Sequence, residues 1–323
     1  MSIIGTYSSH EIRRFLKHHY GIDDVSLSQT NHGLDNSVFL LQPTDSEEPI
    51  AVLKIVETKR KQDIENGINI SMSLGECIHH IEYWCDKNGN VVSALPGNHK
   101  PCYVYRYIKG NHPEINTTEK SEQLANLLKS LHGLGKCGSV PLQSLLEKEY
   151  RDISQYWTKE VEAGCKRDFP ERFDFYTQAI SRVCREFRLS SDTKITCPVG
   201  ITHSDLTPSN IIETNDGDWI CIDFDGATKS GYQLVDVAQA ISKSELSDNN
   251  ELLKAFIECY FSDTNDSVIQ DLNLYISAFC IKAMLSTDYY TYNIPKLSPA
   301  WSKEHATNTL NRLQKSFENA MSK

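Results

Sequence analysis

The sequence predicts an α+β protein of two lobes, in which a small β-rich lobe precedes a large, mainly helical one. Short apolar runs rich in β-branched residues dominate up to about residue 108, and helical periodicity dominates afterwards. One short hairpin signal interrupts the helical part, whereas a doubly wound sheet would alternate strands and helices throughout. We therefore expect a first lobe over residues 1–108 and a second over residues 109–323.

The composition is that of a globular protein. Hydrophobic residues make up 39% of the 323 residues and charged residues 24%, which excludes a disordered or fibrous chain. No stretch of about 20 apolar residues is free of charge, so we expect no membrane span and no membrane partner. The segment after Ser8 is a charged amphipathic helix without the apolar core of a signal peptide.

Charge and cysteine usage narrow the functional classes further. The formal net charge is −10, which argues against a nucleic-acid partner bound through a basic face. The ten cysteines include no C-x-x-C pair and no cluster with zinc-ligand spacing. We expect reduced thiols and a cytoplasmic location. Nothing in the sequence predicts an oligomeric state.

The first lobe contains three strand-like runs and one helix. Alternating and β-branched residues predict strands over 38–41, 50–56 and 102–108, with a polar loop between the first two. Helical spacing predicts a helix over 61–74, and Gly75 is placed to end it.

The second lobe begins with a capped helix. Asn116 is the expected N-cap with Glu119 as its capping partner, and leucines at helical spacing follow as far as Gly133. Further helices are expected over 146–163, 171–188 and 234–320. The runs 210–212 and 219–222 flank an Asp-Gly pair, which predicts a β-hairpin.

The residues with the clearest chemistry lie around this hairpin. Asp205 follows His203 by two positions, Asn210 comes five residues after Asp205, and Asp223 follows the hairpin. Phosphoryl transfer needs an oriented acceptor hydroxyl and metal-neutralised phosphates, and two carboxylates with an amide on one short scaffold supply those oxygens. The protein-kinase catalytic loop has the same Asp-to-Asn spacing.

His-x-Asp-x-x-x-x-Asn followed by Ile-Asp-Phe-Asp resembles the catalytic motif of the aminoglycoside phosphotransferase and choline kinase family. The likeness extends over most of the chain, and the segment 33–41 is similar to the homoserine kinase type II-like branch. Segments 52–55, 105–110, 127–132 and 234–238 resemble the lysine strand, the hinge, the first C-lobe helix and the element after the metal-binding Asp. The resemblance implies a bilobal protein-kinase-like fold with ATP and Mg²⁺ as cofactors.

The resemblance also implies a role for each matching residue. Asp205 would be the catalytic base, Asn210 and Asp223 would hold Mg²⁺, and Lys54 would contact the α- and β-phosphates. Glu65, in the following helix, would orient Lys54. Supporting roles fall to His203, Asp225 and Asp236, and the nucleotide would also meet Gly33, Asn36, Ser37, Tyr105 and Tyr107.

Some of these residues have a second interpretation. His203 is expected to pack structurally, and Asp225 is either a further metal or substrate ligand or a turn residue. The phosphate-covering Gly-x-Gly-x-x-Gly is absent, so Gly33, Asn36 and Ser37 would cover the phosphates through backbone contacts. A P-loop around Gly135 fails, because Ser130 replaces the first glycine and Cys137 replaces Ser or Thr.

The expected substrate is a small hydroxylated molecule. An aminoglycoside, homoserine and a choline-like amino alcohol all remain open, and the acid-rich segment 201–272 favours an amine-bearing acceptor. Homoserine would need a cation such as Lys282 for its carboxylate. Aromatic residues of the helical lobe are either a cation-binding wall or ordinary core; they are Tyr156, Trp157, Tyr275, Phe279, Tyr289, Tyr290 and Tyr292. The alternatives are a bacterial stress-response-type Ser/Thr protein kinase and a catalytically weak kinase-fold binding module.

Overall fold

The computed structural model describes residues 7–30, 36–75, 81–189, 196–261, 266–293 and 303–321. The chain divides into two compact units. The first runs to His112 and includes Asn210–Ala227, and the second holds Pro113–Ser209 and most of the chain from Thr228 onward. The hairpin segment thus groups with the β-rich unit, whereas the sequence-based boundary at residue 108 assigned it to the helical lobe. Strand pairing explains this, because Glu213 and Thr214 pair with Asn111 and Gly110.

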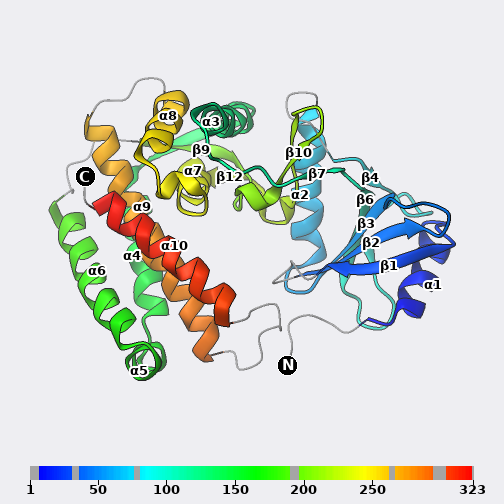
Figure 1. Cartoon of the computed structure of the whole chain (residues 1–323), viewed down its shortest axis with the longest axis horizontal. Coiled ribbons are helices and arrows are strands. Elements are labelled where there is room, and N and C mark those ends of the chain that lie inside the picture. The colour runs from blue at the N-terminus through cyan, green and yellow to red at the C-terminus, as the bar shows by residue number, and fades with distance from the viewer. Residues whose placement is uncertain are drawn as a thin grey trace. The chain divides into compact units, whose positions relative to one another are not determined.

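An antiparallel sheet with the order β1-β2-β3-β6-β4 forms the centre of the first unit, and β5 also pairs with β6 (Figure 1). The helices of this unit are α1 (Ser9–His19) and α2 (Lys61–Ser73). Its sheet strands are β1 (Val25–Thr30), β2 (Asn36–Pro43), β3 (Ala51–Val56), β4 (Tyr83–Trp84), β5 (Ser93–Ala94) and β6 (Pro101–Arg106).

Apolar side chains cover both faces of β3. Because side chains alternate between the two faces along the strand, the position of Lys54 determines the face on which it lies. Leu53 and Ile55 join the cluster that contains Ile12, Phe15 and Leu16 of α1. Val56 joins a second cluster with Ile64 and Ile68 of α2. Successive side chains of a strand point to opposite faces, so Lys54 lies on the α2 side of the sheet.

A second small sheet of the first unit carries the predicted hairpin. Its order is β11-β10-β7, with β7 (Gly110–Asn111), β10 (Ile211–Thr214) and β11 (Trp219–Cys221). Gly217 adopts a φ of 86° in the turn, a conformation that glycine reaches without steric cost. The short helix η2 (Pro208–Asn210) precedes the hairpin and η3 (Phe224–Gly226) follows it.

The second unit is mainly helical, with a three-stranded sheet of order β12-β9-β8. Figure 1 shows α9 beside α10, and α3 also packs on α8 and α4 on α9. Its elements are α3 (Thr118–Gly133), β8 (Lys136–Pro141), α4 (Leu142–Tyr156), α5 (Lys159–Asp168), α6 (Pro170–Leu189), β9 (Thr196–Thr202), β12 (Thr228–Tyr232), α7 (Gln233–Ser242), η4 (Glu245–Ser247), α8 (Asn250–Phe261), α9 (Asp266–Asn293) and α10 (Lys303–Met321).

Most predicted elements are confirmed, and two details were wrong. Thr117, not Asn116, caps α3, because its Oγ1 accepts from the backbone N–H of Lys120 at 3.2 Å. The helix expected over 146–163 is two helices, α4 and α5. They separate at Trp157, whose ψ of 66° is not helical, and Thr158 caps the second one.

Candidate functional site

Lys54 of β3 contacts two carboxylates that follow β11. Its Nζ atom lies 2.5 Å from Oδ1 of Asp223 and 2.8 Å from Oδ2 of Asp225. Lys54 is 4% exposed and Asp225 is 3% exposed, so water screens their attraction little. The sequence-predicted lysine and the sequence-predicted metal ligand Asp223 are therefore neighbours in the first unit.

The charges of this cluster are mutually stabilising. Burial alone would lower the pKa of Lys54, but the carboxylates of Asp223 and Asp225 raise it above its ordinary value, so the ammonium form persists. Tyr103 of β6 donates a 2.7 Å hydrogen bond to Oδ1 of Asp225. Burial, followed by the charge of Asp225, raises the pKa of the Tyr103 phenol. Asp225 is thus an ion-pair partner of Lys54 that Tyr103 holds in place.

The pairing expected for Glu65 differs from the one observed. Oε1 of Glu65 lies 3.5 Å from Nζ of Lys61, one turn earlier on α2. The helix buries Ile64, Gly67 and Ile68 instead, which leaves Glu65 at the margin of the buried face. Asp223 and Asp225 supply the carboxylates that contact Lys54, in the place where Glu65 was predicted.

Asp223 and Asn210 both lie at the base of the hairpin. The N–H of Ile222 donates to the carbonyl oxygen of Asn210 at 2.9 Å, which places Asn210 opposite the residue before Asp223. Asp223 has φ 67° and ψ 53°, a left-handed conformation that costs a non-glycine residue roughly 1–2 kcal/mol. Such strain is typical of residues that are held in place for function.

These two residues fit a magnesium ion that is bound together with a nucleotide. Mg²⁺ prefers hard oxygen ligands and usually takes only one or two from protein, completing its shell with phosphate and water. Asp223 offers a carboxylate that is 32% exposed, and Asn210 offers an amide oxygen. In the part of the chain that the structure describes, no three His, Cys, Asp or Glu side chains form a self-contained metal site.

The expected nucleotide loop and hinge are partly described. Gly33 lies outside the described residues, and Asn36 begins β2 opposite Val56. Ser37 is buried, and its hydroxyl donates to Oε1 of Glu57 at 3.1 Å. In the hinge, the Tyr105 ring lies beside those of Tyr83 and Tyr103, and Tyr107 donates its N–H to the carbonyl of Ile50. Their roles toward a nucleotide stay predictions.

The loop before the hairpin is held by Asp236 of α7. Its Oδ2 accepts from the N–H of His203 at 2.8 Å, and its Oδ1 accepts from the N–H of Ser204 at 2.7 Å. The Nε2 atom of His132 lies 3.1 Å from the same Oδ2. Ser204 has a φ of 67°, so Asp236 stabilises a backbone turn that a serine rarely adopts. His203 itself is fully buried.

Two further contacts to this loop had no signal in the sequence motifs. Nε2 of Gln239 donates to the carbonyl oxygen of Ser204 at 2.9 Å. Nζ of Lys243 lies 3.0 Å from Oδ1 of Asp205, the predicted base. Both residues belong to α7 or its C-cap, more than thirty positions after the loop, and a local motif cannot reveal such a pairing.

Two of the aromatic residues that could form a cation-binding wall are core, and Tyr156, Trp157 and Tyr289 are half-buried. Tyr275 is fully buried and Phe279 is 4% exposed, while Trp157 stacks on Phe173. Lys282 lies 2.6 Å from Oε2 of buried Glu149 and stands over the Phe279 ring. The side chains of Tyr290 and Tyr292 lie outside the described residues.

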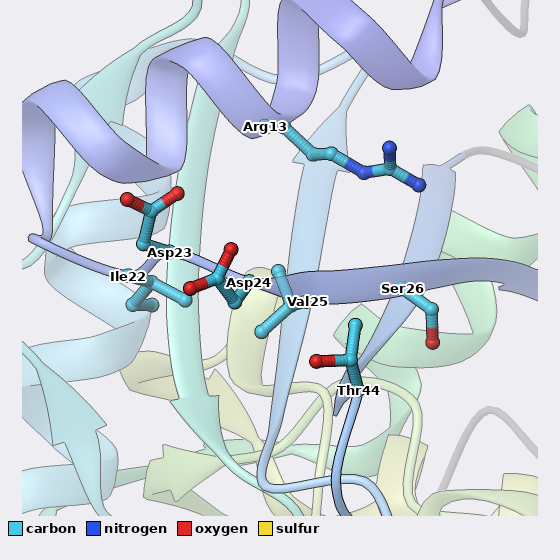
Figure 2. A pocket seen from close by; sticks show the side chains of 7 residues that line it. All are labelled: Arg13, Ile22, Asp23, Asp24, Val25, Ser26 and Thr44. Carbon is cyan, nitrogen blue, oxygen red and sulfur yellow. The ribbon is translucent and has the colours of Figure 1, made fainter.

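A hollow lies in the first unit, at the start of β1 (Figure 2). It has a volume of about 220 Å³ and is lined by Arg13, Ile22, Asp23, Asp24, Val25, Ser26 and Thr44. None of the predicted site residues lines it.

The described residues contain nine cysteines, all with free thiols. None of the helices that the structure describes is both long and apolar enough to span a membrane.

Solved kinases have the same architecture. A spectinomycin phosphotransferase in complex with ADP and spectinomycin aligns with a TM-score of 0.68 at 15% identity, over 98% of this chain and 99% of that chain. A microcompartment-associated aminopropanol kinase gives a TM-score of 0.64 at 15% identity, over 97% of each chain. A choline kinase from Streptococcus pneumoniae gives 0.61 at 16% identity, over 97% of this chain and 98% of that chain.

These likenesses establish the protein-kinase-like fold. No match was found among curated protein sequences. The sequence model of the protein family described as the phosphotransferase enzyme family matches residues 26–268, which is three quarters of the chain. The protein therefore belongs to this family of phosphotransferases.

Proposed function

We propose that the protein transfers the γ-phosphate of ATP to a hydroxyl group of a small, amine-bearing acceptor, with Mg²⁺ as its metal. The observation that carries the proposal is the contact of Lys54 with Asp223, which joins the predicted phosphate-binding cation to the predicted metal ligand. A buried lysine beside a partly exposed carboxylate suits a site where phosphate and metal are bound together. The nine free thiols of the described residues support a cytoplasmic location.

In this proposal the first unit binds the nucleotide. Bound Mg²⁺ would be held by Asn210 and Asp223 and would neutralise charge on the β- and γ-phosphates. Lys54 is charged and shielded from water, so it would attract the α- and β-phosphates more strongly than a surface lysine. Asp225 and Tyr103 would keep its ammonium group in position when the phosphates arrive.

Asp205 would act as the general base. Its carboxylate accepts the proton of the acceptor hydroxyl while the acceptor oxygen forms a bond to the γ-phosphorus. The bond from that phosphorus to the bridging oxygen breaks, and ADP leaves with the electron pair. Asp236 supports this role, because it fixes the backbone of the two residues that precede Asp205.

An amine-bearing acceptor is favoured by charge. Segment 201–272 contains fourteen acidic residues and three lysines. Lys282, the cation that a free carboxylate such as that of homoserine would need, is already paired with Glu149. Similar folds include an aminopropanol kinase and an ethanolamine kinase from Plasmodium vivax, both named for amino alcohols.

The test is phosphate transfer by purified protein. ADP release and product mass are followed with ATP, Mg²⁺ and a panel of ethanolamine, aminopropanol, choline, spectinomycin and homoserine. Asp205→Asn should lower kcat by roughly 10²–10⁴ with nucleotide affinity retained. Asp216→Asn, in the exposed hairpin turn, is the matched control and should leave kcat unchanged. Phosphorylation of proteins but of no small alcohol, or full turnover by Asp205→Asn, would overturn the proposal.

A further inference from the structure

One face of α7 contacts the loop that carries the predicted base. Asp236, Gln239 and Lys243 are spaced i, i+3 and i+7, which places them within about 60° of one another around the helix axis. They contact successive residues of the loop. Asp236 binds the N–H groups of His203 and Ser204, Gln239 binds the carbonyl of Ser204, and Lys243 binds the side chain of Asp205.

Resting on the function proposed above, we propose that Lys243 is a positioning residue for Asp205. Asp236 and Gln239 fix only the backbone of Ser204 and its neighbours, and an aspartate side chain still rotates about χ1 and χ2. The 3.0 Å contact from Nζ of Lys243 to Oδ1 limits that rotation. A carboxylate has about four lone-pair sites, so accepting from Lys243 leaves it able to take the acceptor proton.

The pair contributes little to stability. The side chains of Lys243 and Asp205 are 35% and 49% exposed, and exposed pairs of this kind typically contribute about 0.2–1 kcal/mol. Its consequence lies in geometry, since displacement of a reacting group by about 1 Å can cost ~10²-fold in rate.

The backbone of Lys243 is itself fixed. It is the C-cap of α7, and its N–H donates to the carbonyl of Gln239 at 3.0 Å. Its own carbonyl accepts from Nη1 of Arg312 in α10 at 3.2 Å, and the carbonyl of Ser242 accepts from the hydroxyl of Ser316. Because this helix end is held in place, the side chain of Lys243 starts from a fixed backbone position. Its ammonium group can therefore hold the carboxylate of Asp205 in one orientation.

The first comparison uses Lys243→Met, Lys243→Arg and a control, Lys254→Met. Lys254 forms an exposed pair with Glu258 within α8 and touches no predicted site residue. With ATP and the best acceptor of the panel, Lys243→Met should lower kcat by about 10-fold or more, within the range of a misplaced base. The KM for ATP and the Tm should stay unchanged, Lys243→Arg should recover most of the loss, and Lys254→Met should match wild type.

The second comparison separates positioning from a direct role. In an Asp205→Asn background, Lys243→Met should lower the residual rate no further, because residues that act as a unit are not additive. A full loss in that background, or wild-type kcat for Lys243→Met alone, would overturn the assignment while leaving the proposed function intact. If the wild-type protein phosphorylates none of the small alcohols, the proposed function fails and this inference fails with it.

Discussion

The Nζ atom of Lys54 lies 2.5 Å from Oδ1 of Asp223, although the two residues are 169 positions apart in the chain. The strand β3 and the end of the hairpin β10–β11 are thereby joined by an ion pair within one unit. Because Asp223 is also the predicted metal ligand, a change at this residue acts on both the metal and the lysine.

Asp223→Asn should abolish productive binding of Mg²⁺, while the ion pair of Lys54 with Asp225 should remain. An amide is a weaker ligand than a carboxylate for a hard divalent cation. The measurement is a Mg²⁺ titration of nucleotide affinity, in which wild type should show a strong dependence and the variant little. Equal dependence on Mg²⁺ in both proteins would show that Asp223 is not a ligand.

Asp225→Asn should lower stability more than Tyr103→Phe does. The Asn variant removes one of two charges that hold a buried ammonium group, a loss of about 1–3 kcal/mol in the free energy of unfolding. Tyr103→Phe removes only a neutral donor to Asp225, at a cost of about 1 kcal/mol. Urea unfolding of both single variants and the double variant measures the coupling. Strictly additive losses would mean that Tyr103 and Asp225 act independently.

Gly67→Ala should destabilise the protein and weaken nucleotide binding. A Cβ at this helical glycine would lie 2.0 Å from the carbonyl oxygen of Phe224, so α2 or the turn after Asp223 must move. Overpacking typically costs about 1–3 kcal/mol, more than the roughly 1 kcal/mol that alanine gains in helix propensity. Gly133→Ala is the control, because its Cβ would meet open space, and it should be neutral or slightly stabilising. Similar effects at both glycines would contradict the close packing.

The kcat/KM for a cationic acceptor should fall as salt rises from about 0.05 to about 0.5 M, over which the Debye length shortens from roughly 14 to 4 Å. The dependence should be modest, because several acids of segment 201–272 already have partners, such as Asp205 with Lys243 and Asp248 with Lys315. The kcat at saturating acceptor is the control and should be insensitive to salt. A best acceptor that is neutral or anionic would show that the acidic segment is only solvated surface.

The sequence predicted the elements whose pattern is strong. The helix after β3 and the strands that carry Lys54 and Tyr105 follow directly from periodicity and from Gly75. The sheet of β8, β9 and β12 was missed, because β8 is mostly exposed and β12 contains Lys229, Ser230 and Gly231. Such strands lack an alternating apolar face, so only pairing across the fold defines them.

The sequence predicted the residues of the candidate site better than it predicted the contacts between them. The buried positions of α2 repeat at Ile64 and Ile68, which already placed Glu65 away from the centre of the buried face. That signal argued against Glu65 as the partner of Lys54, but nothing local pointed to Asp225. The contact of Lys243 with Asp205 could not be predicted either, because it depends on how α7 lies against the loop.

A buried carboxyl in the second unit should make stability depend on pH. Asp288 of α9 is 1% exposed and accepts hydrogen bonds from the hydroxyl of Tyr176 at 2.5 Å and from Arg172 at 3.2 Å. Burial raises the pKa of Asp288 above its ordinary value, although both partners act to lower it.

The sign follows from proton binding. Between the unfolded pKa of about 4 and the raised folded pKa, the folded state binds this proton more tightly than the unfolded state does. The contribution of Asp288 is therefore complete below pH ~4 and is lost as the pH rises through the folded pKa. Relative to Asp288→Asn, which cannot titrate, the wild-type free energy of unfolding should decline over that window. Tyr176→Phe removes a bond that lowers this pKa, so the decline should extend to higher pH. Urea unfolding at a series of pH values measures all three proteins, and a wild-type stability that rises relative to Asp288→Asn would mean that the partners outweigh burial.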